Sequence, residues 1–114
     1  MIQPISNSNL GRVIRDTLRA AGEKNAVMHN MSDGYIIQRG FNQTIDVLKE
    51  DRLVTFTIDY WDRRKAQKAM NDLLLNIPLR YNGTTITFSA DGIRDVREKL
   101  KTFLAVDKPK ECYK

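Results

Sequence analysis

Residues 44–60 read TIDVLKEDRLVTFTIDY, and no other stretch predicts the fold class as firmly. Apolar and polar side chains alternate on both sides of Glu50-Asp51, as they do in two strands joined by a tight turn. A two-residue turn at this point produces apolar pairs on one face and polar pairs on the other. The apolar pairs are Val47–Val54 and Ile45–Phe56, and the polar pairs are Thr44–Thr57 and Asp46–Thr55. Register and hydrophobic pattern agree, which predicts an antiparallel hairpin with one buried face.

Further strands are predicted on both sides of this hairpin. Upstream, AVMHN and YIIQRGF are separated by the turn signal Asp33-Gly34. Downstream, LRYNGTTITF contains Asn82-Gly83, a strong signal for a hairpin turn that pairs Leu79 with Ile86. Whether the two hairpin regions belong to one sheet stays open at the level of sequence.

Three segments show helical rather than strand periodicity, at about residues 8–22, 62–77 and 91–105. Gly22 and Pro78 are expected to end the first two, and Asp91 or Ser89 to cap the third. The predicted order is therefore α-ββββ-α-ββ-α. It indicates an α+β fold with a mainly antiparallel sheet and helices packed on one face.

The length and composition of the chain indicate one globular domain over residues 1–106, and the last residues suggest a polar, flexible tail over residues 107–114. The chain has 114 residues, 41% of them hydrophobic, and a single cysteine, Cys112, which cannot form an internal disulfide. The first residues lack the pattern of a signal peptide, and the longest apolar run is too short to span a bilayer. We therefore expect a cytoplasmic protein that does not contact membranes.

The formal net charge of +5 is unevenly distributed. Residues 1–59 contain seven basic and seven acidic side chains, whereas residues 60–114 contain twelve basic and seven acidic ones. This asymmetry predicts a positive field over one part of the molecule and favours an anionic partner, DNA or RNA.

The strongest candidate for such contacts is YWDRRKAQK, residues 60–68. On a helical wheel its cations point to solvent, and they oppose the helix dipole because they stand at the N-terminal end. They are Arg63, Arg64, Lys65 and Lys68. Tyr60 shares the parity of the buried side chains, whereas Trp61 is either exposed, where it could stack on a base, or buried over the core edge. The same helix end offers N–H groups to a phosphate.

Two more rows of cations accompany this cluster. Arg12, Arg15 and Arg19 lie on the polar face of the first helix, and Arg94, Arg97 and Lys101 flank the core stripe of the last. Arg80 is a further candidate from the second hairpin. The leading hypothesis is a non-enzymatic, basic regulatory protein that contacts the phosphate backbone.

Two alternatives remain at this stage. Leu75, Leu48 and Leu53 are predicted to be exposed and suit a protein interface, in a homodimer or in an inhibitor such as a phage or mobile-element anti-defence protein. The second alternative is a metal-independent ribonuclease built from Tyr35, Arg39, His29 and Arg52. No cofactor or metal is predicted, because His29 is the only histidine and no glycine-rich phosphate loop is present.

Overall fold

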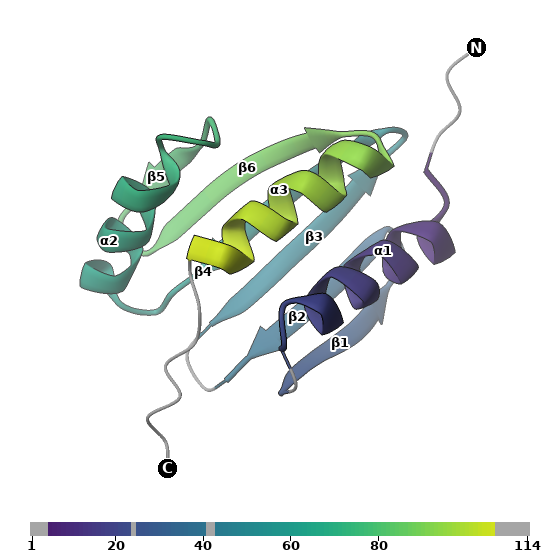
Figure 1. Ribbon diagram of the computed structural model, residues 1–114, viewed down its shortest axis with the longest axis horizontal. Helices are drawn as coiled ribbons and strands as arrows, with labels where there is room; N and C mark the ends of the chain where they lie inside the picture. The colour runs from purple at the N-terminus through teal and green to yellow at the C-terminus, as the bar shows by residue number, and fades with distance from the viewer. Residues whose placement is uncertain (1–4, 24, 41–42, 107–114) are drawn as a thin grey trace.

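The computed structural model describes residues 5–23, 25–40 and 43–106, which form three helices and six strands (Figure 1). In chain order they are α1 (Asn7–Ala20), β1 (Ala26–Met31), β2 (Gly34–Arg39), β3 (Thr44–Glu50), β4 (Leu53–Asp59), α2 (Arg63–Leu73), β5 (Arg80–Asn82), β6 (Thr85–Asp91) and α3 (Ile93–Val106). The predicted element order and the α+β class are confirmed. The tail predicted for residues 107–114 lies outside the described residues.

All six strands form one antiparallel sheet in the order β1-β2-β3-β4-β6-β5. The first four strands are a meander, and the second hairpin joins the same sheet beside β4. Because β6 lies between β4 and β5, these two strands run parallel, and α2 connects them across β6. This split βαβ unit places α2 next to α3 (Figure 1).

The predicted register of the β3–β4 hairpin is wrong by two residues. Val47 faces Phe56 instead of Val54, because the turn is Asp51-Arg52, one residue later than predicted. Asp51 adopts a positive φ of 55°, a conformation that Asp tolerates better than most residues. The other pairs are Ile45–Ile58, Asp46–Thr57 and Thr44–Asp59.

The second hairpin shows the same shift. Ile86 faces Tyr81 instead of Leu79, and the turn is formed by Gly83-Thr84, with Gly83 at a φ of 65°. A shift of two residues leaves every side chain on its predicted face, since strand faces alternate with a period of two. The predicted faces are consequently correct in both hairpins, although all three residues of β5 are exposed.

The core lies between one face of the sheet and the helices. Phe56 of β4 and Phe88 of β6 stack with 5.0 Å between ring centroids, and Phe103 of α3 packs against Phe88 at 6.3 Å. Leu10 and Ile14 of α1 are fully buried in the same cluster. Each aromatic pair contributes about 0.5–1.5 kcal/mol beyond its buried area. α1 and α3 lie side by side over this face (Figure 1).

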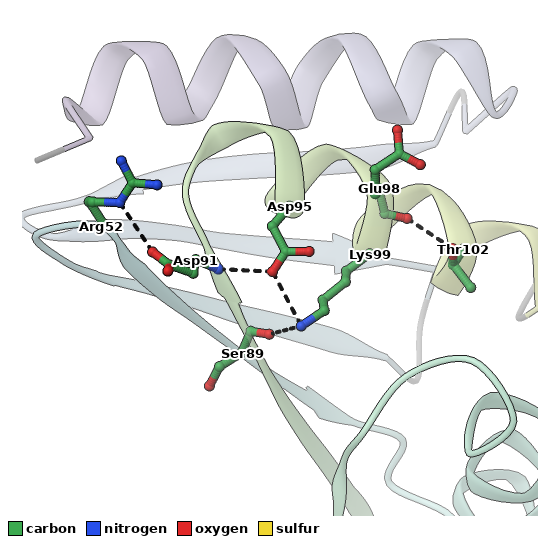
Figure 2. Close-up of polar contacts among 7 residues, drawn as sticks. All are labelled: Arg52, Ser89, Asp91, Asp95, Glu98, Lys99 and Thr102. Carbon is green, nitrogen blue, oxygen red and sulfur yellow. Dashed lines mark hydrogen bonds and ion pairs between the residues drawn. The ribbon is translucent and has the colours of Figure 1, made fainter. Parts of the chain in front are cut away.

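The start of α3 is fastened to the sheet by polar contacts (Figure 2). Asp91 and Ser89, the two predicted caps of this helix, are instead residues of β6, and the Asp91 carboxylate pairs with Arg52 at 3.2 Å. The Asp91 backbone N–H donates to Asp95 Oδ2 at 3.0 Å. Lys99 Nζ then donates to the Ser89 carbonyl at 2.6 Å and pairs with Asp95 at 3.3 Å. These contacts hold the first half of α3 to the end of β6, which the Arg52–Asp91 pair connects to the β3–β4 turn.

No helix of the described chain covers the opposite side of the sheet, which we call the open face (Figure 1). Threonine and serine dominate it on β4 and β6, where Thr55, Thr57, Thr87 and Ser89 alternate with buried residues. The molecule therefore has two distinct sides, a helical side and a bare sheet.

Candidate nucleic-acid interface

Trp61 stands exposed between the end of β4 and the start of α2. Its side chain is 66% exposed, and its backbone φ of 59° lies in the left-handed region. The Trp61 N–H donates to Oδ1 of Asp59 at 2.9 Å, which holds this turn. A bulky residue rarely adopts the conformation, which costs about 1–2 kcal/mol. Neither core burial nor backbone preference explains why an indole occupies this position, whereas the neighbouring Tyr60 is buried as predicted.

Four cations follow on α2, and all of them are exposed. They are Arg63, Arg64, Lys65 and Lys68. Within the part of the chain that the structure describes, Lys68 alone among them forms an ion pair, at 3.4 Å from Asp72. The first turn contains no acidic residue. Cations at this end of a helix oppose its dipole, so the arrangement favours an anion outside the helix rather than the stability of α2.

The backbone N–H groups at the start of α2 are partly occupied. Asp62 is the N-cap, and its Oδ1 accepts hydrogen bonds from the N–H groups of Arg64 at 2.8 Å and Lys65 at 3.2 Å. The prediction that this helix end offers free N–H groups to a phosphate is wrong for these two residues. An anion at this end meets side-chain cations rather than these backbone donors.

The other two predicted rows of cations lie on the same side of the molecule. α3 lies between α1 and α2 and contacts both helices (Figure 1). Every cation in both rows is exposed, and none forms an ion pair with another described residue. Together with the α2 cluster they form what we call the basic helical layer: Arg12, Arg15, Arg19, Arg63, Arg64, Lys65, Lys68, Arg94, Arg97 and Lys101.

Charge is separated between the two sides of the molecule. The three helices contain eleven basic and four acidic side chains, a net +7, against +5 for the whole chain. On the open face the register places four acids and one base: Asp46, Glu50, Asp59, Asp91 and Arg80. Arg80 faces Thr87 there, so it does not extend the α2 cluster. The excess of basic side chains is therefore on the helical side.

Apolar side chains gather on the open face near the first four strands. Four of them are 44–50% exposed, and half-buried Ile36 accompanies them. We call this set the open-face apolar patch: Val27, Met31, Ile36, Leu48 and Leu53. Leu48 and Leu53 were predicted to be exposed together. Val27 and Met31 were not predicted, although the alternation of AVMHNM places both on one face of the strand. Leu75, which is 87% exposed, lies in the turn after α2 rather than on the sheet, so it does not belong to this patch.

The four residues considered for a ribonuclease do not converge. His29 lies on the open face of β1, whereas Tyr35 and Arg39 point from β2 into the core. The Tyr35 hydroxyl donates to the Asn7 carbonyl at 2.8 Å. Arg52 lies in the β3–β4 turn. A single substrate cannot contact all four, because they lie on different sides of the sheet.

Arg39 instead forms polar and cation–π contacts within the core. Its guanidinium donates to both oxygens of Glu23 at 2.9 Å and to Gln43 Oε1 at 2.6 Å, and it lies 5.3 Å from the centre of the Phe103 ring. The side chains of Arg39 and Glu23 are only 4% and 6% exposed. This pair links the end of α1, the end of β2 and α3, and no sequence pattern indicated it.

Among the described residues, no three His, Cys, Asp or Glu side chains are grouped as they would be around a metal ion. No helix in these ranges is long and apolar enough to cross a bilayer. No protein-family model, curated protein or solved structure matches the chain.

Proposed function

We propose that this protein is a non-enzymatic nucleic-acid-binding regulator, in which the basic helical layer contacts phosphates and Trp61 stacks on a base. The conformation of Trp61 carries the proposal, because an exposed indole is held in a strained backbone beside three cations of the first turn of α2. Strained residues concentrate at functional sites. An aromatic platform flanked by cations is the common device for binding unpaired bases along a charged backbone.

The proposal favours single strands over duplexes. Stacking on Trp61 requires a base whose face is accessible, and paired bases in a duplex do not offer one. The cations of α2 stand closest to Trp61 in sequence and supply the central phosphate contacts. The rows on α1 and α3 extend the positive surface on the same side of the sheet. Backbone contacts of this kind accept DNA and RNA without sequence preference.

Binding is tested with labelled single-stranded DNA, single-stranded RNA and duplex DNA of about 20 nucleotides, which exceeds the site size of typical single-strand-binding folds. Fluorescence anisotropy at about 50 mM and about 200 mM salt gives the affinity and its salt dependence. Both single strands are expected to bind more tightly than the duplex. Absence of binding to any probe at the lower salt concentration contradicts the proposal.

Two charge-reversal variants locate the surface. Arg64→Glu/Lys68→Glu reverses two cations of the basic helical layer and is expected to weaken binding by at least about tenfold. Arg80→Glu is the control on the open face, where the same type of change is expected to alter affinity less than about twofold. Equal losses per reversed charge in the two variants would assign the effect to net charge alone.

The second candidate function is a protein-interaction module, and the open-face apolar patch favours it. A bare sheet face with several half-exposed large apolar side chains is unusual in a monomer. If a second copy covers it, light scattering shows a dimer that Leu48→Ser/Leu53→Ser dissociates. A monomer at all concentrations removes the homodimer version of this alternative.

A further inference from the structure

Among the described strands, β1 is an edge of the sheet. It pairs with β2 on one side, and within residues 5–23, 25–40 and 43–106 no strand pairs with its other side. Its six residues, AVMHNM, contain neither the lysine nor the proline that usually blocks an edge. The opposite edge, β5, has only three residues. β1 is therefore the longer edge, with a row of main-chain donors and acceptors directed away from the sheet.

A groove runs between β1 and the C-terminal half of α1. Its volume is about 700 Å³, and Leu18, Ala26 and Met28 contribute its apolar lining. Arg15 and Arg19 line the same groove from the helix. Glu23 also lines it, but its carboxylate is bound by Arg39 at 2.9 Å. The groove thus combines an open strand edge, an apolar floor and two cations from one helix.

We propose that β1 accepts an extended acidic segment of a partner protein as a seventh strand. Strand addition satisfies the main-chain groups of β1, and alternate side chains of the segment point to opposite faces. On the helical side, acidic side chains would meet Arg15 and Arg19. On the open face, apolar side chains would lie beside Val27 and Met31, which are about half exposed. This inference does not depend on nucleic-acid binding.

Charge favours an acidic segment over a second copy of this chain. If β1 paired with β1 of another copy, the two α1 helices would approach with Arg15 and Arg19 on both sides. β1 contains no acidic residue to offset that repulsion. A nucleic acid could neutralise the arginines, but it has no peptide groups to pair with the strand edge.

The probe is a fluorescent nine-residue peptide of alternating glutamate and valine, blocked at both ends. Heteronuclear NMR is expected to show its saturable binding, with shifts and slowed amide exchange along β1. A peptide of the same sequence with N-methyl groups on alternate amides keeps the charge but cannot pair as a strand. It is expected to bind at least about tenfold more weakly. Equal binding of the two peptides overturns strand addition.

Matched variants test the role of the arginines. Arg15→Glu/Arg19→Glu changes the groove, whereas Arg12→Glu/Arg97→Glu makes the same charge change outside it. The first is expected to weaken peptide binding at least about tenfold and the second less than about threefold. Equal weakening overturns the assignment to this groove. A concentration-dependent dimer with protected β1 amides in the absence of peptide also overturns the proposal, because it assigns the edge to a second copy.

Discussion

At the scale of single residues, Trp61 combines exposure with a strained backbone. Trp61→Gly removes the strain of the left-handed backbone conformation, because glycine has no Cβ, whereas Trp61→Ala retains it. We expect the glycine variant to be more stable than the alanine variant by about 1 kcal/mol in urea unfolding. Both variants lack the indole, so both are expected to bind single strands about tenfold more weakly. An alanine variant as stable as the glycine variant would show that no strain is present.

Gly34 is needed for the close approach of β2 and β3. Its φ is 153°, and a Cβ there would overlap the carbonyl oxygen of Val47. Gly34→Ala is expected to destabilise the fold by at least about 2 kcal/mol, measured from the urea midpoint. Gly22→Ala is the control, because Gly22 also has a positive φ but a Cβ there meets nothing within 4 Å. Its expected cost is about 1 kcal/mol, and equal costs in the two variants would contradict the steric account.

At the scale of elements, the buried pair Arg39–Glu23 joins α1, β2 and α3. Removing one partner leaves an uncompensated buried charge, so Arg39→Met is expected to cost about 3–5 kcal/mol. Adding Glu23→Leu removes that charge and is expected to recover part of the loss. A urea double-mutant cycle measures the coupling between the two residues. Strictly additive losses would mean that the pair does not act as a unit.

The β3–β4 hairpin and the Arg39–Glu23 pair show which structural features the sequence predicts and which it does not. Alternation in TIDVLKEDRLVTFTIDY predicted the correct faces, since burial alternates with a period of two. It could not distinguish registers that differ by two residues, and the true register depends on the positive φ of Asp51. The Arg39–Glu23 pair escaped prediction because its partners are 16 residues apart and join only when the core assembles.

At the scale of the whole molecule, the decisive feature is that all three helices lie on one side of the sheet. Each row of cations was visible in the sequence from helical periodicity. The sequence also predicted that the helices pack on one face of the sheet, but whether the rows converge there was open, because the order of the helices across that face depends on the crossover of α2 over β6. The sequence also did not determine whether Trp61 is exposed, because the alternation of strand faces ends at the turn before α2. Helical periodicity therefore identified the cations, and the topology of the helices and the sheet determines how they are arranged in space.

The most direct test of this proposal uses the chain's one tryptophan as its own probe. A single-stranded oligonucleotide is titrated at several salt concentrations while the fluorescence of Trp61 is recorded. We expect saturable quenching, with log K falling against log salt at a slope of about −3 for four neutralised phosphates, and at about −1.5 in Arg64→Glu/Lys68→Glu. Unchanged fluorescence at low salt, or the same slope in the variant, would contradict binding through Trp61 and the basic helical layer.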